Sequence, residues 1–205
     1  GCASPGNRCR TRCSASTPFP CRLPSLEPSP NAKPNICRAL LRALLLRQSG
    51  CHETVLTAAD RAPVWPTGWR GSLSHSEDIA IAVVTAQSNG LHPGIDIEHL
   101  QPGIMQESAN MFVAQAEQAL LARCGLDKEW ALLAAFSAKE SLFKALYPRV
   151  QRMFDFNAAA IVALAPANHR FTLRLNETLS DEFPAGRQFS GEYHISVGRV
   201  LTCLW

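Results

Sequence analysis

The chain has 205 residues, of which 46% are hydrophobic and 18% charged, and its formal net charge is +3. This length and composition predict one domain, or two small halves that share a core. No run of eighteen apolar residues occurs, so we expect no stable membrane insertion. The charge is too mild to indicate a nucleic-acid partner, and the start lacks the apolar stretch of a secretory signal, which favours a cytoplasmic protein.

Residues 1–36 differ in composition from the rest of the chain. Half of the 14 prolines lie before Ile36, and the segment is rich in Ser, Cys and Arg without a helical or strand period. Such a composition is typical of disordered or linker segments. Five of the eight cysteines lie within the first 37 residues, but no CxxC pair occurs, and we expect free, reduced thiols. The ordered pattern begins near Arg38.

The remaining residues alternate between helical and strand patterns. We expect helices at 38–48, 108–125 and 127–148, the last with Asp127 as its N-cap, strands at 79–85, 95–98, 158–165 and 169–176, a hairpin within 192–205, and a Pro- and Gly-rich turn region at 60–71. The order helix–strands–helices–strands predicts an α+β fold.

The first chemical signal is the stretch GIDIE, Gly94 to Glu98. Residues two apart on a strand point to the same face, so Asp96 and Glu98 are expected side by side. Adjacent carboxylates repel each other, and a hard divalent cation such as magnesium relieves that repulsion. A solvated acidic strand edge is the simpler interpretation, and the spacing alone leaves both open.

The second signal is the stretch FSAKESLFKALYP, Phe136 to Pro148, which lies in the helix predicted at 127–148. The chain has only four lysines against sixteen arginines, yet Lys139 and Lys144 both fall here. Glu140 and Lys144 are four residues apart and share a helix face. They form either a surface salt bridge or a third metal carboxylate with ammonium groups beside it for phosphate oxygens.

The third signal is GSLSHSED, which begins at Gly71. Its glycine permits close backbone approach, and Ser72, Ser74 and His75 offer hydrogen-bond donors. Taken alone, the stretch is more typical of a polar turn than of a binding site.

The three stretches in this order, preceded by RAPVWPTGW from Arg61, resemble the 4′-phosphopantetheinyl transferases. The likeness covers about residues 38–205 and is greatest to the enterobactin synthetase component D-like branch of the surfactin-type group. It implies an α+β fold of two similar halves, related by a pseudo-two-fold axis, with the active site in the cleft between them. We place the halves at 37–100 and 101–205 and expect a monomer.

The resemblance also implies an activity. Such enzymes move the phosphopantetheine arm of coenzyme A, the co-substrate, to a serine of an apo acyl, aryl or peptidyl carrier protein. They need Mg²⁺ and release adenosine 3′,5′-bisphosphate. In this family the region 105–121 helps to meet the carrier, so an exposed apolar strip there would be informative. The sequence leaves the carrier and its pathway, siderophore or other, open.

Site residues follow from the same resemblance. Asp96, Glu98 and Glu140 are the expected metal ligands, and Glu140 and Lys144 the expected catalytic residues. The residues expected to contact coenzyme A are Arg38, Arg61, Ser74, His75, Lys139 and Lys144.

The chain departs from the family in two places. Phe136 stands where tryptophan is common, and the family helix that starts Lys-Ala-Glu-His-Leu is not readable before Arg38. A shifted reading frame over residues 32–37 can encode that string, so an out-of-frame N-terminus is one hypothesis. A catalytically impaired homologue that still binds coenzyme A or the carrier is the alternative function, and an unrelated magnesium phosphohydrolase is a third.

Overall fold

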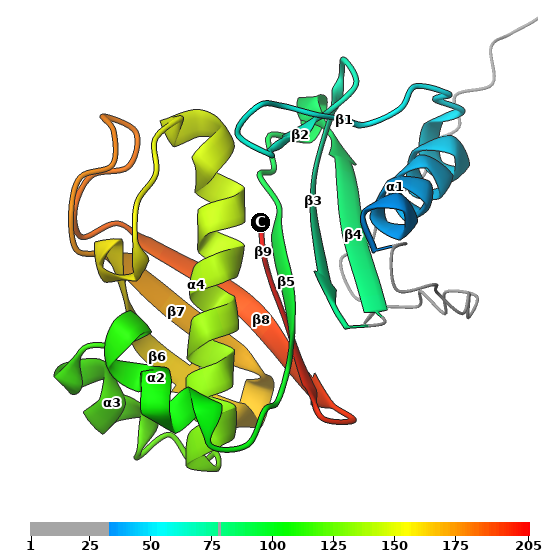
Figure 1. Ribbon diagram of the computed structural model, residues 1–205. Helices are drawn as coiled ribbons and strands as arrows, with labels where there is room; N and C mark the ends of the chain where they lie inside the picture. Colours follow the sequence, from blue (N-terminus) through cyan, green and yellow to red (C-terminus); the bar gives the residue numbers. More distant parts are fainter. Residues whose placement is uncertain (1–32, 78) are drawn as a thin grey trace, which may run out of the picture.

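The computed structural model describes residues 33–77 and 79–205, without the side chains of 33–36 and 38. The predictions made for residues 1–32 and for the side chain of Arg38 therefore lie outside the described residues. The described chain mixes helices with antiparallel sheets, which confirms the α+β class (Figure 1). No helix in the described part is long and apolar enough to cross a membrane. The four cysteines of this part are free, as predicted.

The helices are α1 (Lys33–Ser49), α2 (Ile104–Phe112), α3 (Gln115–Leu121) and α4 (Lys128–Val150). The strands are β1 (Leu56–Thr57), β2 (Pro63–Val64), β3 (Trp69–Ser76), β4 (Ile79–Ala86), β5 (Gly94–His99), β6 (Ala159–Ala165), β7 (Arg170–Leu175), β8 (Gln188–Ser196) and β9 (Arg199–Leu204). Short 3₁₀ turns occur at Gln87–Asn89, Phe156–Ala158 and Pro166–Asn168.

The larger unit is a five-stranded antiparallel sheet with α4 lying across one face. Its strand order is β5-β9-β8-β7-β6, so the edge strand β5 pairs with the last strand of the chain (Figure 1). Leucines and alanines of α4 pack against this face, where Leu133, Leu142 and Leu173 are at most 1% exposed. Burial of this apolar surface is the main stabilising contribution to the unit.

Close contact between α4 and β5 depends on one glycine. A β-carbon at Gly94 would overlap with the carbonyl oxygen of Ser141 and press on the side chain of Ala145. Because Gly94 has no side chain, the helix can lie directly on the strand. This approach brings the carboxylates of β5 within reach of the polar residues of α4.

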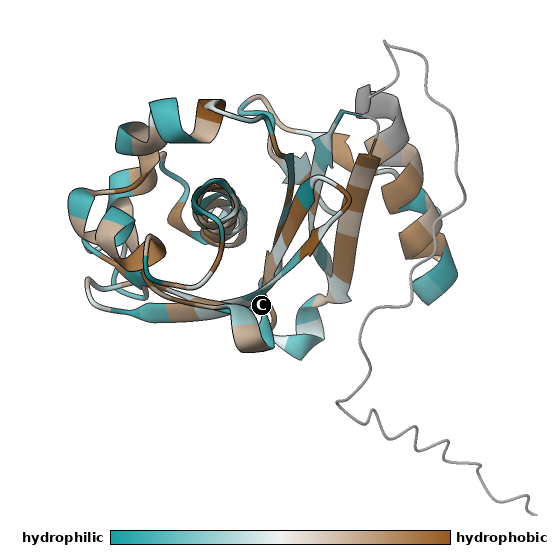
Figure 2. Ribbon diagram, turned by 90° about the horizontal axis from the view of Figure 1, so that it is seen from below, coloured by the Kyte–Doolittle hydropathy of each residue, from teal (hydrophilic) through white to brown (hydrophobic). Residues whose placement is uncertain are grey.

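The smaller unit is the β3–β4 hairpin with α1 packed on its outer face (Figure 2). Leu41 and Leu45 of α1 are fully buried against Val84 of the hairpin. Trp65 and Trp69 pack on the same cluster. The predicted boundary at residue 100 directly follows β5, which pairs with β9, so the expected first half supplies an edge strand to the sheet of the second. The pseudo-two-fold relation between the halves stays a prediction.

Four of the predicted boundaries were wrong. The polar stretch at 71–76 is part of strand β3 because it pairs with β4 along its whole length. The helix predicted at 108–125 is two helices, since Val113 has an extended backbone (φ −131°) between α2 and α3. Helix α4 passes Pro148 and ends at Val150, where the lost backbone donor falls in the last turn. The first helix begins at Lys33, five residues early, with Pro34 in its first turn.

Candidate active site

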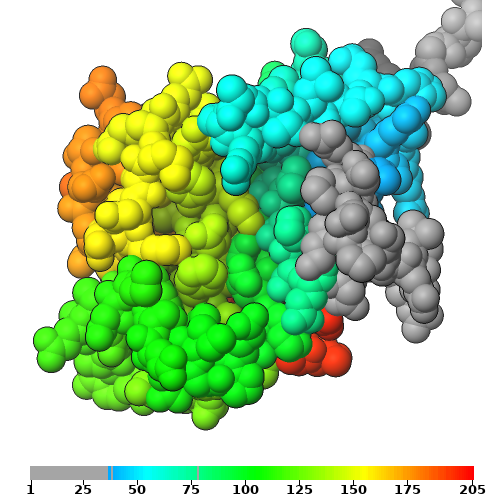
Figure 3. All heavy atoms as spheres, in the orientation of Figure 1, coloured from blue at the N-terminus to red at the C-terminus, as the bar shows by residue number. Residues whose placement is uncertain are grey.

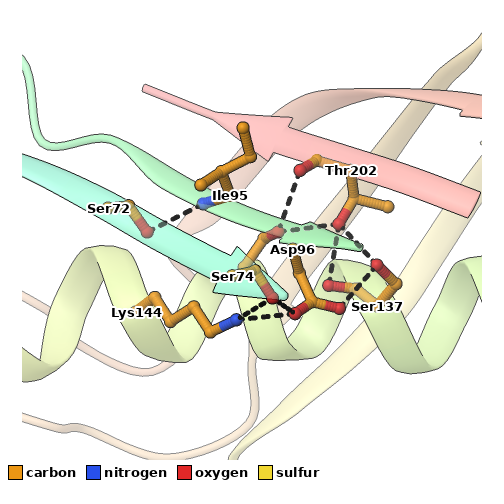
Figure 4. A network of polar contacts seen from close by, with 8 residues as sticks. Ser72, Ser74, Ile95, Asp96, Ser137, Lys144 and Thr202 are labelled. Carbon is orange, nitrogen blue, oxygen red and sulfur yellow. Dashed lines mark hydrogen bonds and ion pairs between the residues drawn. The ribbon is translucent and has the colours of Figure 1, made fainter. Parts of the chain in front are cut away.

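The polar site lies where β3, β5 and α4 meet. Ser72 and Ser74 point from β3 toward β5 (Figure 4). The two strands are not paired in a sheet, and the serine hydroxyls form hydrogen bonds between them. The backbone N–H of Ile95 donates to Oγ of Ser72 at 3.0 Å, and Oγ of Ser74 donates to Oδ1 of Asp96 at 2.8 Å. The serines of the third predicted signal therefore join the smaller unit to the larger one.

Asp96 is the centre of this site and is only 1% exposed. Its Oδ1 accepts from Ser74 and from Nζ of Lys144, the latter at 2.6 Å. Its Oδ2 accepts from Oγ of Ser137 at 2.8 Å. A buried carboxylate is tolerated only where charge and hydrogen bonds compensate for the lost water. Asp96 has both kinds of compensation.

Behind Asp96 lies a group of buried hydroxyls that fixes α4 to β9. Ser137, Ser141 and Thr202 are all fully buried. Oγ1 of Thr202 donates to the carbonyl oxygen of Ser137 at 2.9 Å and lies 2.7 Å from Oγ of Ser141. Thr202 is also the partner of Asp96 across the β5–β9 pair. Ser137 therefore orients the carboxylate of Asp96, while the three hydroxyls together fix the helix to β9.

Glu98 and Glu140 lie close enough to Asp96 for its negative charge to raise their pKa values. Burial, together with the neighbouring carboxylates of Asp96 and Glu140, raises the pKa of Glu98 to about 7, while Lys144 opposes the shift. Burial and Asp96 likewise raise the pKa of Glu140. The structure thus brings the three predicted acidic residues into one electrostatic neighbourhood, with Lys144 as the cation among them.

The chemistry of this donor set suits a hard divalent cation. It offers only carboxylate and hydroxyl oxygens, and burial together with repulsion between the carboxylates raises the pKa values of Glu98 and Glu140 although Lys144 opposes the shift. Among residues 33–77 and 79–205, however, no three acidic, histidine or cysteine side chains stand in ready-made ligand positions. Lys144 provides the positive charge against Asp96 instead.

The position of Lys139 differs from what its predicted contact with coenzyme A requires. It is 4% exposed, and its Nζ donates to the carbonyl oxygens of Phe112 at 2.7 Å and Phe156 at 3.1 Å. The same Nζ forms an ion pair with Oε1 of Glu117 at 2.9 Å. All three ammonium protons are used inside the protein, so the structure does not bring Lys139 to a phosphate-binding position.

The remaining predicted contacts lie on the hairpin side. Arg61 is exposed in the loop between β1 and β2, and His75 is exposed near the end of β3. The neighbour of Arg61, Asp60, accepts a 2.6 Å hydrogen bond from the hydroxyl of Tyr147 on α4. Ser74 is buried, and its hydroxyl is engaged with Asp96 and Lys144.

A cavity of about 730 Å³ opens beside Glu140, on the face of α4 that is covered by the segment after the helix. Phe143, Phe154 and Phe156 line it, together with Lys139 and Arg152. Figure 3 shows the surface hollowed between α4 and this following segment. The volume of this cavity lies within the range of small-molecule and cofactor sites.

Sequence reasoning missed Ser137, Thr202 and Glu117 as parts of the buried polar framework. Ser137 stands three residues before Glu140 in the quoted helix, and this spacing on one helix face was a usable signal. Thr202 and Glu117 are far from the motifs in the chain, so only the fold reveals their contacts.

Two family models match the chain. The model described as the 4′-phosphopantetheinyl transferase superfamily matches residues 93–198, and the model of the 4′-phosphopantetheinyl transferase N-terminal domain matches residues 36–85. The first contains all three acidic residues and Lys144, and the second contains Arg61, Ser74 and His75.

Curated relatives carry related names. Enterobactin synthase component D of Escherichia coli (strain K12) is 45% identical over 101 residues, 49% of this chain and 47% of the relative. The 4′-phosphopantetheinyl transferase Svp of Streptomyces mobaraensis is 32% identical over 176 residues, 82% of this chain and 68% of the relative. The 4′-phosphopantetheinyl transferase PptT of Mycobacterium tuberculosis is 26% identical over 202 residues, 88% of this chain and 87% of the relative. The match spans about half the length of the enterobactin synthase relatives.

Proposed function

Because the chain belongs to the 4′-phosphopantetheinyl transferase superfamily, we propose that it transfers the phosphopantetheine arm of coenzyme A to a serine of an apo carrier protein. The reaction forms a phosphodiester with the serine oxygen and releases adenosine 3′,5′-bisphosphate. The observation that carries the proposal is the grouping of Asp96, Glu98, Glu140 and Lys144 on β5 and α4, inside the matched region.

Asp96, Glu98 and Glu140 would hold Mg²⁺ in this proposal. When bound, the cation neutralises charge on the diphosphate of coenzyme A and stabilises the leaving group. The support from the chain is its all-oxygen donor set and the raised pKa values of Glu98 and Glu140. A bound cation would offset the cost of burial and the repulsion that raise these pKa values.

Glu140 and Lys144 take the two catalytic roles. Glu140 accepts the proton of the attacking serine hydroxyl, and burial makes its carboxylate a stronger base than a free glutamate. Lys144 is partly exposed on the same face of α4, so its ammonium can contact phosphate oxygens. The two side chains thus act on the nucleophile and on the phosphate from adjacent turns of one helix.

Coenzyme A would lie across the seam between the two units. The exposed Arg61 and His75 stand on the hairpin side, where they would contact the nucleotide phosphates. The cavity beside Glu140 would take the pantetheine arm, since its aromatic lining suits an extended, mostly uncharged chain. Arg38 would join the nucleotide contacts by family resemblance alone.

The carrier would dock on α2. Ile104 and Met111 are 46% and 76% exposed and stand seven residues apart, which places them on one helix face. Contiguous exposed apolar surface is a feature of interaction sites, and these two side chains lie in or next to the region 105–121, where the family likeness predicts contact with the carrier. The likeness to enterobactin synthase component D favours an aryl or peptidyl carrier domain of siderophore synthesis. We also infer that the protein is cytoplasmic and monomeric. Sedimentation of the purified chain tests whether it is a monomer.

Incubation of the full chain with coenzyme A, Mg²⁺ and an apo carrier tests the proposal. A mass gain of one phosphopantetheine on the carrier supports it. Binding of coenzyme A or carrier without a mass gain would favour the impaired homologue. Release of inorganic phosphate with an unmodified carrier would favour a phosphohydrolase.

A further inference from the structure

The two oxygens of Asp96 lie in different surroundings. Oδ2 accepts a hydrogen bond from the hydroxyl of Ser137, which is fully buried. Oδ1 accepts from the buried Ser74 at 2.8 Å and from Lys144, whose side chain is 25% exposed and can move toward a ligand. Of the donors to the two oxygens, only Lys144, on Oδ1, is partly exposed and can be displaced.

Ser137 has little freedom to follow the carboxylate if it turns. Oγ1 of Thr202 lies 2.9 Å from Oγ of Ser137 and donates to the carbonyl oxygen of the same residue at 2.9 Å. Ser141 contacts Thr202 from the next turn of α4 but does not contact Asp96. The hydroxyl of Ser137 is thus held in place by Thr202 and aimed at a single oxygen of Asp96.

We propose that Ser137, supported by Thr202, is a positioning residue that restricts Asp96 to binding a cation through one oxygen, and that it thereby sets the preference of the site for Mg²⁺ over Ca²⁺. The inference rests on the part of the proposed function that assigns Asp96 to the cation. Mg²⁺ requires compact octahedral coordination and takes single carboxylate oxygens, whereas Ca²⁺ accepts more ligands and both oxygens of a carboxylate. A donor fixed on Oδ2 occupies one lone pair of that oxygen and holds the carboxylate plane in place, which weakens the two-oxygen mode and so disfavours the larger ion.

Competition binding with Mn²⁺ as the probe tests this inference without reference to turnover. The electron paramagnetic resonance signal of free Mn²⁺ is followed with the full chain and coenzyme A, while Mg²⁺ or Ca²⁺ displaces the probe. For Ser137→Ala we expect the ratio of the Ca²⁺ to the Mg²⁺ dissociation constant to fall by roughly tenfold, at the lower end of effects seen when the partner of a metal ligand is lost. Ser141→Ala is the matched control, because it removes an equally buried hydroxyl that does not touch Asp96, and its ratio should equal that of the wild type.

Thr202→Val is the second variant in case Ser137→Ala does not fold, which circular dichroism would reveal. It keeps the shape of the side chain and removes only the supporting hydroxyl, so the ratio should shift in the same direction by a smaller factor. An unchanged ratio in the folded Ser137→Ala protein, or equal shifts in Ser137→Ala and Ser141→Ala, overturns the inference and leaves the transfer proposal intact. Absence of Mn²⁺ binding by the wild type with coenzyme A overturns both the inference and the proposed metal site.

Discussion

Lys144 of α4 donates to Oδ1 of Asp96 on β5 at 2.6 Å, across 48 residues of sequence. The pair joins the helix motif to the strand motif and provides the positive charge at the centre of the site. Because the ammonium is partly exposed, it is also the group that can turn to an incoming phosphate.

Substitution of Lys144 by alanine should therefore raise the Michaelis constant for coenzyme A. A charge-assisted hydrogen bond contributes about 1.5–3 kcal/mol, which corresponds to roughly tenfold or more in affinity. Steady-state kinetics with an apo carrier measure the change. Lys128→Ala is the control, since it removes an exposed lysine from the first turn of the same helix. An unchanged constant in Lys144→Ala would remove Lys144 from the site.

Substitution of Glu140 by glutamine should abolish transfer without loss of stability. The change removes a cation ligand and a base, and it removes a charge that burial and the repulsion from Asp96 both disfavour. Unfolding in urea should show equal or greater stability than the wild type. Near-normal turnover in this variant would contradict the role of Glu140 in both metal binding and proton transfer.

Glu98 should make the metal-free protein less stable as the pH rises. Its pKa is about 7 in the folded state against 4.5 in the unfolded chain, so the folded state keeps a proton that the unfolded state loses between these values. The stability linked to that proton is complete below pH 4.5 and is lost as the pH rises through 7. A shift of one pKa unit corresponds to about 1.36 kcal/mol, so the free energy of unfolding falls by at most about 3 kcal/mol. Glu98→Gln should make this decline smaller and leave the part that Glu140, whose pKa is also raised, contributes, as measured by urea unfolding with a chelator present. A parallel decline in both proteins would contradict the assigned pKa.

The ion pair of Lys139 and Glu117 should contribute to the stability of the fold rather than to the binding of coenzyme A. Loss of one partner of a buried ion pair costs about 3–5 kcal/mol because the other charge stays buried. We expect Lys139→Met to lower the free energy of unfolding by about that amount, and the double variant with Glu117→Gln to regain most of it. A higher Michaelis constant for coenzyme A with unchanged stability would instead restore Lys139 as a phosphate contact.

The sequence predicted the parts of the site that local patterns encode. Strand β5 was readable from its alternating residues, and the N-cap of α4 from Asp127, whose side chain accepts from the backbone of Glu129. Four-residue spacing placed Glu140 and Lys144 on one face. Five-residue spacing turns Lys139 about 140° away from Lys144 on an α-helix, so their separation was also open to prediction.

Other features depend on contacts that no local pattern reveals. The serine-rich stretch of β3 has weak strand propensity, and it is a strand because β4 pairs with it and its serines bond to β5. Thr202 enters the site only because β9 pairs with β5 at Asp96. Such long-range pairing is set by the whole fold.

The most direct test of the account is the intact mass of an apo carrier after incubation with coenzyme A and either wild-type protein or Asp96→Asn, with Mg²⁺ or with a chelator. Asp96→Asn is preferable to alanine, since it keeps the shape of a buried side chain that Ser74, Ser137 and Lys144 all contact. We expect a gain of one phosphopantetheine only for the wild type with Mg²⁺, with the gain restored when Mg²⁺ is added in excess of the chelator. A gain for Asp96→Asn, or for the wild type in the chelator, would contradict a divalent cation held by Asp96, Glu98 and Glu140.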